Sequence, residues 1–262
     1  MRLDVVDSTN RYAADAVRHG APEGLVVLAE EQTAGRGRLG RAWVAPRGAA
    51  LLCSIVFRPR LRADELHLVP TAVALAAADA AQHMSGAPIG LKWPNDLVAG
   101  DAKVGGVLAE IVTVGGRGDD AGNALVVGVG VNLEAAGVRA VLESDSTGRD
   151  PIPATGLAEL AGRAVARDDL FAALLGSLGG RYGASGRPGP STMDEYRGRC
   201  STIGKQVRVD TVRRSFFGRV LDVDDQGRLV VESGGDNLAL DSADVLHLRD
   251  DRGDGSRPDW GP

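Results

Sequence analysis

Arginines and glycines alternate along one short stretch of the chain, and this spacing suits the binding of an anion. The stretch contains Gly35, Arg36, Gly37, Arg38, Gly40 and Arg41, with Gln32 before it and Trp43 after it. Glycine lets a backbone turn tightly and approach a ligand closely, and the planar arginine fork binds carboxylate or phosphate oxygens through paired hydrogen bonds. The stretch therefore predicts a loop that wraps an anionic ligand. A mobile surface loop with incidental arginines is the alternative that remains open.

The same glycines satisfy the G-x-G-x-x-G pattern of dinucleotide-binding folds, but the residues that follow argue against such a site. A dinucleotide site needs a helix directly after the glycines and an acidic residue about 20 positions later. Here Pro46 and Gly48 follow, and then an apolar run covers residues 51–57. The pattern therefore indicates a loop that leads into a strand.

A second candidate group is a lysine at the end of an apolar segment. Residues 89–93 read as a strand that ends on Lys92 and Trp93 and is stopped by Pro94. A rigid element would hold the charge of Lys92 in a fixed position, which suits the stabilisation of negative charge in a transition state. The more common role of a lone lysine is a solvated surface charge.

Polar residues also begin the first helix that the sequence predicts. Ser8, Thr9 and Asn10 follow a short strand at residues 3–6 and precede a helix that runs to about His19. These residue types cap helix N-termini. A helix N-terminus with spare hydroxyls and amides can equally hold a polar group of a ligand. Position alone leaves both roles open.

The elements that must hold these groups form a mixed sheet with helices. The sequence predicts strands at residues 25–29, 51–57 and 124–132, a hairpin over 97–112, and helices at 70–84, 157–166, 168–182 and 191–199. Asp168 is expected to cap the third of these helices. The nearly continuous apolar run at 124–132 is typical of a strand buried on both faces. Glycines at 105, 106, 128 and 130 predict places where another group packs closely on the backbone.

After residue 200 the pattern changes to short strands separated by turn residues. They are expected at 206–210, 216–223, 228–232, 237–240 and 245–248, a spacing that predicts a small β-barrel. We expect residues 115–123 to form a loose loop and 134–153 to be irregular. The polar residues after Arg249 are expected to be disordered.

Composition limits the function classes. The 262 residues, 44% of them hydrophobic, fit one large domain with a small second one. A net charge of -5 and the lack of a long basic tract argue against a general nucleic-acid binder. Only Cys53 and Cys200 occur, and no signal peptide or membrane-spanning apolar run is visible. We therefore expect a cytoplasmic protein without membrane partners, in which Cys53 is a buried, inert thiol.

Five motifs occur in the order seen in biotin protein ligases, and the sequence resembles that family over residues 1–249. The motifs are Asp7-Ser-Thr-Asn10, Gln32-Thr-Ala-Gly-Arg-Gly-Arg-Leu-Gly-Arg-Ala-Trp43, Lys92-Trp-Pro-Asn-Asp96, Lys103-Val-Gly-Gly-Val-Leu-Ala-Glu110 and Gly128-Val-Gly-Val-Asn132. Ser201-Thr-Ile-Gly-Lys-Gln-Val-Arg-Val209 is similar to the start of the SH3-like domain of that family. The resemblance implies an α+β fold: a mixed-sheet catalytic domain of the biotin/lipoate ligase type at 1–200, an SH3-like β-barrel at 201–249, and a tail at 250–262.

The resemblance also implies a two-step reaction. Biotin and ATP would give biotinyl-5'-AMP and pyrophosphate, with Mg2+ accompanying ATP. A lysine of a biotin carboxyl carrier protein domain would then attack the mixed anhydride. A site that brings a carboxylate onto the α-phosphate needs fixed positive charge and exclusion of water, and a glycine loop can close over the intermediate.

The family pattern implies roles for particular residues. Lys92 and Arg36 would be catalytic. Biotin would be bound by Ser8, Thr9, Asn10, Gln32, Gly35, Arg36, Gly37, Arg38, Lys92, Gly105 and Gly106. ATP would be bound by Arg36, Arg38, Arg41, Trp43, Lys92, Asn95 and Asn132. No metal ligand is assigned.

Two departures and two alternatives accompany this resemblance. The chain starts almost directly at its first strand, so we expect no DNA-binding repressor domain, and Ala154-Thr-Gly-Leu157 stands where relatives often have Ala-Thr-Ser-Leu. A lipoate ligase or octanoyl transferase of the same fold is one alternative, although neither cysteine lies in a glycine-rich loop beside a base. A non-enzymatic sensor of biotin or nucleotide is the other.

Overall fold

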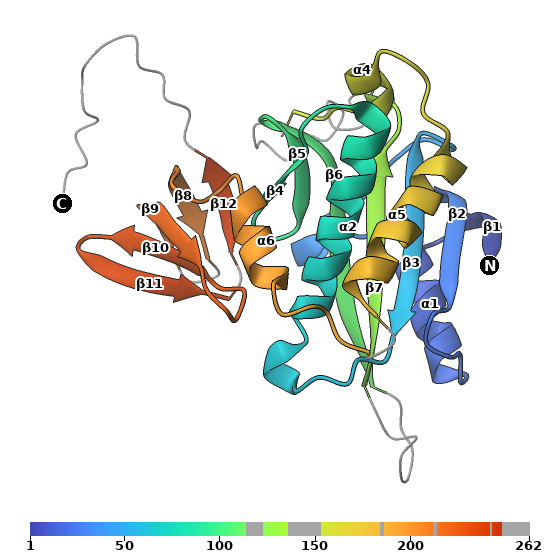
Figure 1. Cartoon of the computed structure of the whole chain (residues 1–262), viewed down its shortest axis with the longest axis horizontal. Helices are drawn as coiled ribbons and strands as arrows, with labels where there is room; N and C mark the ends of the chain where they lie inside the picture. Colours follow the sequence, from blue (N-terminus) through green and yellow to red (C-terminus); the bar gives the residue numbers. More distant parts are fainter. Residues whose placement is uncertain (114–122, 136–152, 184–185, 212–213, 242, 248–262) are drawn as a thin grey trace.

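The chain is organised around two β-sheets in a computed structural model (Figure 1). The structure describes residues 1–113, 123–135, 153–183, 186–211, 214–241 and 243–247. A seven-stranded sheet occupies the N-terminal part and a five-stranded sheet the C-terminal part. None of the helices in the described ranges is long and apolar enough to cross a membrane.

The large sheet has the strand order β1-β2-β3-β7-β6-β5-β4. Its strands are β1 (Arg2–Val6), β2 (Val26–Gln32), β3 (Ala50–Phe57), β4 (Gly90–Lys92), β5 (Asp96–Ala99), β6 (Ala102–Thr113) and β7 (Asn123–Asn132). The pair β1 and β2 is parallel, and the other pairs are antiparallel. This confirms the mixed sheet that the sequence predicts.

Helices cover both faces of this sheet because the central strands are apolar on both sides. On β3, Cys53 and Ile55 belong to the core beneath α2 (Leu68–Ser85), whereas Val56 packs with residues of α1 (Thr9–Arg18) on the other face. The α2 side also carries α4 (Leu157–Ala161), α5 (Arg167–Arg181) and α6 (Thr192–Arg199). One-turn helices occur at Arg38–Gly40 and Ala63–Glu65. The face with α1 is the one on which the candidate site lies.

The small sheet is antiparallel, with the order β11-β10-β9-β8-β12. Its strands are β8 (Gln206–Asp210), β9 (Ser215–Val223), β10 (Leu229–Ser233), β11 (Asp236–Leu240) and β12 (Asp244–His247). Alternating residues such as Val207, Val209 and Val220 point into a buried core and are 0% exposed. The small C-terminal β-domain predicted from short, turn-separated strands is therefore confirmed.

Apart from shifts of one or two residues at the ends of elements, such as α2 and β4, three details differ from the sequence predictions. The helix expected at 157–166 ends at Ala161, because Gly162 takes a left-handed conformation with φ +65°. Asp168 does not cap α5; Ala166 occupies the N-cap position, and the Asp168 carboxylate instead accepts a hydrogen bond from Arg2. Strand β2 extends to Gln32, because β1 pairs with it as far as that residue. The expectations for residues 115–122, 136–152 and the tail lie outside the described residues.

Candidate functional site

A buried polar cluster joins α1, β2 and β3. Gln32 Oε1 accepts hydrogen bonds from the backbone amide and the hydroxyl of Thr9, at 2.8 and 3.0 Å. The Ser54 hydroxyl lies 2.6 Å from Asn10 Oδ1 and 2.8 Å from Thr9 Oγ1, and its single proton can be donated to only one of them. Thr9, Asn10 and Ser54 are at most 4% exposed. Since burying unpaired polar groups is costly, this network fixes the orientation of each side chain.

Ser8 has the capping role that its residue type predicts. Its side chain accepts a hydrogen bond from the Arg11 amide at 3.5 Å, and Ser8 is 3% exposed. The structure therefore agrees with both roles considered for these residues. Ser8 caps α1, whereas Thr9 and Asn10 belong to the buried polar cluster.

Asn10 continues the polar cluster to β6. Its Nδ2 donates to Glu110 Oε2 at 2.7 Å and to the Leu108 carbonyl at 3.2 Å. A Cβ atom at Gly128 would lie 2.3 Å from Asn10 Oδ1, which is closer than real Cβ atoms come. Position 128 must therefore be glycine for Asn10 to lie on β7. This confirms the prediction of close packing on that glycine.

The arginine loop folds back on itself. The Gly37 amide donates to the Arg41 carbonyl at 2.7 Å, and the Trp43 amide donates to the Gly35 carbonyl at 3.0 Å. A Cβ atom at Gly35 would be 2.3 Å from the Trp43 carbonyl oxygen and 3.0 Å from Gln32 Nε2. The loop thus leads into β3, as the sequence predicts, and brings its backbone against the amide of Gln32.

The arginines of this loop differ in exposure. Arg36 has 56% of its side chain exposed, and its Nη1 lies 4.0 Å from Glu110 Oε1. Arg41 is exposed, whereas Arg38 is half-buried. Arg36 thus lies beside β6, the strand that carries Glu110, the partner of Asn10. Its pairing with Glu110 is long and solvated, so an incoming anion could displace it at little cost.

Trp43 lies on β7 with a lysine above it. A Cβ atom at Gly130 would be 2.7 Å from Cε2 and Cζ2 of the indole. The Lys103 ammonium is 5.5 Å from the centre of the indole ring, within cation–π range. The indole Nε1 is buried and has no hydrogen-bond partner among the described residues. Close packing at Gly130 is confirmed, and the group that packs there is Trp43.

Lys103 is a residue that the sequence analysis did not single out. Its Nζ lies 2.6 Å from Asp96 Oδ1, and the two side chains are 26% and 16% exposed. Both flank Gly106, where a Cβ atom would approach Asp96 Oδ1 to 3.5 Å and Lys103 Cε to 3.7 Å. The motif that contains Lys103 is visible in the sequence, but nothing in its residue types indicates that this lysine faces Trp43.

Lys92 lies on the same face but farther out. It pairs directly with Asp96 across β4 and β5, and directly paired residues share a face of a sheet. Strand β4 is the edge strand, so Lys92 lies two strands, or roughly 10 Å, from Gly106 on β6. The charge of Lys92 also contributes to the lowered pKa of His247 in the C-terminal domain, behind the larger effect of burial.

The remaining predicted residues make structural contacts. Asn95 Nδ2 donates to the Val107 carbonyl at 2.9 Å, which stabilises the hairpin. Asn132 Nδ2 donates to the Thr155 carbonyl at 3.1 Å, while its buried Oδ1 has no partner among the described residues. A Cβ atom at Gly105 would be 2.5 Å from the Gly130 carbonyl oxygen. Close packing at Gly105 is therefore confirmed.

The segment that departs from the family pattern lies beside Lys103. The Lys103 amide donates to the Pro153 carbonyl at 2.6 Å, and the Thr155 amide donates to the Lys103 carbonyl at 2.9 Å. A Cβ atom at Gly156 would lie 2.8 Å from the Ala135 amide nitrogen. Glycine at this position thus lets the segment pack against the backbone of Glu134 and Ala135, which follow β7.

Both cysteines are buried free thiols. Burial raises the pKa of the Cys53 thiol to about 12, and burial is also the main cause of the raised pKa of Cys200. The reactive form of cysteine is the thiolate, so neither thiol is activated for nucleophilic attack. The burial expected for Cys53 is therefore confirmed.

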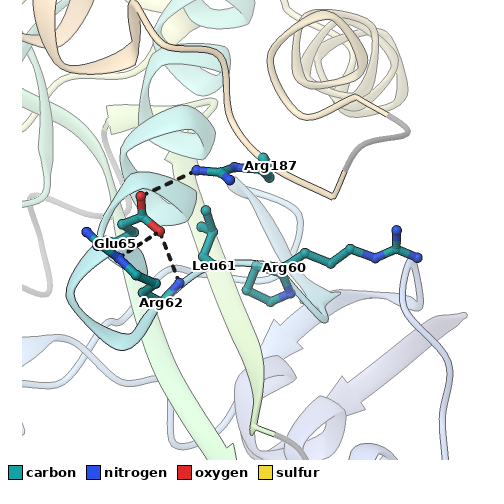
Figure 2. Close-up of a pocket in the computed structure, with 6 residues that line it drawn as sticks. Arg60, Leu61, Arg62, Glu65 and Arg187 are labelled. Carbon is teal, nitrogen blue, oxygen red and sulfur yellow. Dashed lines mark hydrogen bonds and ion pairs between the residues drawn. The ribbon is translucent and has the colours of Figure 1, made fainter. Parts of the chain in front are cut away.

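A hollow of about 600 Å3 lies away from this site, near the end of β3 that carries Phe57. It is lined by Arg60, Arg62, Arg187 and Glu65, among others. Figure 2 shows Arg62 and Arg187 directed at Glu65 while Arg60 points away. Two of its arginines are thus already paired with Glu65 and the third points away, so we assign no chemistry to this hollow.

Comparison with known proteins identifies the family. Residues 3–132 match the model of the biotin/lipoate A/B protein ligase family, and residues 202–248 match the biotin protein ligase C terminal domain. A protein from Mycobacterium tuberculosis named biotin--[acetyl-CoA-carboxylase] ligase is 34% identical, over 95% of this chain and 90% of that protein. The chain belongs to the biotin protein ligase family.

Other relatives agree with this assignment. A biotin--[acetyl-CoA-carboxylase] ligase from Paracoccus denitrificans is 31% identical over 92% of this chain and 97% of its own length. The bifunctional ligase/repressor BirA of Bacillus subtilis is 27% identical, and the match covers 92% of this chain but 72% of that protein. The biotin protein ligase of Aquifex aeolicus, solved with biotin and ATP, superposes with a TM-score of 0.75 at 22% identity, over 95% of this chain and 98% of that one. The last comparison confirms the fold.

Proposed function

We propose that this protein activates biotin with ATP as biotinyl-5'-AMP and transfers the biotinyl group to a lysine of an acceptor protein. The observation that carries the proposal is the arrangement along one face of the sheet. A buried hydrogen-bonding cluster at Thr9, Asn10 and Gln32 lies at one end, and Lys103 lies over Trp43 at the other. Such a face can bind a polar ring at one end and stabilise the reaction of an anionic group at the other.

The biotin ring is assigned to the polar cluster. Gln32 Oε1 is already used by Thr9, so its Nε2, which lies beside Gly35, is the group left to donate to a ureido oxygen. Ser8 and Asn10 complete this part of the site. A buried polar group is left without a hydrogen bond when the ligand offers no partner for it, and this disfavours such a ligand strongly. The cluster therefore favours a ureido ring over an apolar dithiolane.

The reacting groups are assigned to the cationic end. The biotin carboxylate oxygen attacks the α-phosphorus of ATP, the bond to the β-phosphate oxygen breaks, and pyrophosphate leaves. Lys103, Arg36 and Arg38 would stabilise the charge that builds up between the two anions, and Lys92 would act from the outer strand. The backbones of Gly37, Gly105 and Gly106 would line the path of the reacting chain.

The nucleotide is assigned to the groups around Trp43. The indole offers a flat apolar surface, and the unpaired Asn132 Oδ1 is an acceptor for an exocyclic amino group of the base. Arg41 and Asn95 are proposed to complete this subsite. In the second step a neutral lysine amine of the acceptor attacks the acyl carbon, AMP leaves with the bonding electrons, and the amine loses a proton.

The Mg2+ that accompanies ATP fits a site without a dedicated set of protein ligands. Among the described residues, no three His, Cys, Asp or Glu side chains are grouped to hold a metal ion. Mg2+ bound to substrate phosphates commonly takes only one or two carboxylates, and Asp96 is the carboxylate nearest the cationic end. Bound there, the ion would neutralise charge on the leaving pyrophosphate.

Partners and organisation follow from the same reaction. We assign the acceptor lysine to a biotin carboxyl carrier protein domain, catalysis to residues 1–200 and a separate SH3-like domain to 201–249. The free thiols of Cys53 and Cys200 suit a reducing cytoplasm. The net charge of -5 offers no general attraction to DNA, and the proposal includes no DNA partner.

The test is to incubate the purified protein with Mg2+, ATP and biotin, first alone and then with a carrier domain. We expect biotinyl-AMP and pyrophosphate in the first incubation, and a biotinylated carrier with one AMP released per transfer in the second. Parallel incubations with lipoate and octanoate should give no transfer. Transfer of lipoate in preference to biotin would contradict the proposal, and ligand binding without adenylate would indicate a sensor.

A further inference from the structure

The edge strand β4 is held from the side of the C-terminal domain. The Ser201 amide donates to the Leu91 carbonyl at 2.7 Å. The Trp93 amide donates to Thr202 Oγ1 at 3.0 Å, and the Trp93 indole Nε1 donates to the Gly227 carbonyl at 2.9 Å. These bonds therefore hold Leu91 and Trp93, the residues directly before and after Lys92. The position of Lys92 therefore depends on residues more than 100 positions later in the sequence.

Thr202 is the central residue of this contact because its hydroxyl lies against Trp93 on one side and His247 on the other. The residue is 0% exposed, and its oxygen accepts from the Trp93 amide and lies 3.2 Å from His247 Nε2. Burial, with smaller effects of Lys92 and Lys205, lowers the pKa of His247 to about 4. The imidazole is therefore neutral at pH 7, and the tautomer of its ring decides whether Nε2 or the Thr202 hydroxyl donates in this bond. The Thr202 hydroxyl thus connects the Trp93 amide to His247 of the C-terminal domain.

The Trp93 amide matters because Trp93 directly follows β4 and is the last residue with an amide proton before Pro94. Residue 94 is a proline and has no amide proton, and β4 is only three residues long. Immediately before Trp93, Lys92 pairs with Asp96, which in turn forms the ion pair with Lys103. A change in the position of Trp93 would therefore displace Lys92 and, across the strand pair, Asp96, which is the ion-pair partner of Lys103.

We propose that Thr202 is a positioning residue for adenylate formation. Through the Trp93 amide, its hydroxyl holds Lys92 and Asp96 in register with Lys103, so that the C-terminal domain contributes to the first chemical step. The inference rests on the proposed function. Thr202 is not expected to affect biotin binding. The polar cluster of Thr9, Gln32 and Ser54 lies on α1, β2 and β3 and makes none of these contacts.

The neighbouring Ser201 provides a matched control. Its hydroxyl donates to the Leu91 carbonyl at 3.2 Å, but its own backbone amide already donates to the same oxygen at 2.7 Å. Removing this hydroxyl leaves the carbonyl paired. Ser201→Ala therefore removes a side-chain bond to the same strand without leaving a buried backbone group unpaired.

The experiment compares Thr202→Val, Thr202→Ser and Ser201→Ala by single-turnover formation of biotinyl-AMP and by the Kd for biotin. Valine keeps the shape but cannot accept from the Trp93 amide. We expect its rate to fall about ten- to hundredfold, as misplacement of reacting groups by about 1 Å does, while the Kd for biotin stays within about twofold. The serine variant and Ser201→Ala should remain within about threefold of wild type. A valine variant as fast as wild type, or a serine variant as slow as the valine variant, would overturn the proposal.

A measurement on the wild-type protein keeps the inference testable if the valine variant does not fold. We expect the Trp93 amide to exchange its proton slowly, like amides of the central strands, because Thr202 holds it in a buried hydrogen bond. Exchange as fast as that of an exposed loop amide would refute the contact. Failure of the wild type to form any biotinyl-AMP would count against the proposed function, while the amide exchange would still decide whether Thr202 holds Trp93.

Discussion

The indole of Trp43 lies directly on the backbone of Gly130, so the loop and β7 approach more closely than any side chain on that glycine would allow. A Cβ atom there would lie 2.7 Å from two indole carbons and 3.2 Å from Nε1. The contact places the ring below the Lys103 ammonium. Two glycines of the central strands, Gly128 and Gly130, thus define where the polar cluster and the cationic end of the site can lie.

Gly130→Ala tests the cationic end. The added methyl group must push Trp43 away from β7, and we expect adenylate formation to slow at least tenfold, the scale of a displaced binding group, with the Kd for biotin unchanged. The readout is single-turnover formation of biotinyl-AMP. Gly176→Ala is the matched control, because it adds the same methyl group in α5 with no atom within 4 Å. It should stabilise the protein by about 0.5–1 kcal/mol without affecting the rate.

Gly128→Ala tests the polar cluster. Its methyl group would collide with Asn10 Oδ1 and separate Asn10 from Ser54. We expect the Kd for biotin to rise by roughly tenfold or more, since displacing one buried hydrogen-bonded group costs about 1–3 kcal/mol. Isothermal titration of the variant with biotin measures the change. Unaltered biotin affinity in a folded variant would show that Asn10 does not contribute to the biotin site.

The sequence predicted the close packing at Gly128 and Gly130 but not the groups that pack there. Glycine in an apolar strand indicates that another group comes close, which is a local signal. That the groups are Asn10 and Trp43 depends on the sheet order, which brings residues about 120 and 90 positions apart together. Element type and order were therefore predictable from local patterns, whereas the contacts across the sheet were not.

The lysines illustrate the same limit. Lys92 stood out because it ends a strand before Pro94, and it does end β4. Lys103 follows a tight turn, and its direction depends on an irregularity in the pairing of β5 and β6 between Leu97 and Val98. A shift of one residue reverses the face on which a side chain lies. Residue types alone do not show such an irregularity, so the sequence could not show that Lys103 approaches Trp43.

The Arg36→Ala variant should release biotinyl-AMP from the site before transfer. Arg36 is the loop arginine beside Glu110, and its 4.0 Å pairing is weak enough to be exchanged for an anionic ligand. Charge-assisted contacts are worth about 1.5–3 kcal/mol, so retention of the adenylate should fall roughly ten- to hundredfold. We expect biotin to appear on lysines of an unrelated protein added to the reaction. Arg11→Ala, which removes an exposed arginine of α1, is the control. Labelling that stays confined to the carrier would contradict the role of Arg36.

Acidification should destabilise the contact at His247. Its pKa is about 4 in the folded protein and about 6.5 when unfolded, so between these values the unfolded chain binds more protons. Stability is therefore lost as the pH falls from 6.5 toward 4, and it is unaffected by this group above that window. Urea unfolding at several pH values should show that His247→Asn loses less stability than wild type across this window. Parallel curves for the two proteins would refute the prediction.

Lys103 should contribute more than Lys92 to the rate of adenylate formation. Lys103 lies between Asp96 and the Trp43 ring, where the carboxylate and the α-phosphate are proposed to meet, whereas Lys92 lies two strands from Gly106. Lys103→Ala should reduce the rate of adenylation about 10²- to 10³-fold, comparable to the loss of an oxyanion-hole donor. Lys92→Ala should reduce it less, and Lys103→Arg should not restore it, because the broad guanidinium does not match a compact ammonium.

Single-turnover formation of biotinyl-AMP measures both lysine variants, and the Kd for biotin shows whether a loss lies in binding or in chemistry. Lys205→Ala is a suitable control, because it removes a lysine of the C-terminal domain whose charge, like that of Lys92, acts on His247. If Lys92→Ala loses more than Lys103→Ala, the reacting groups lie toward the edge of the sheet, and Lys92 is the principal catalytic lysine. If both rates stay within about threefold of wild type, neither ammonium stabilises the transition state, since threefold corresponds to less than about 1 kcal/mol.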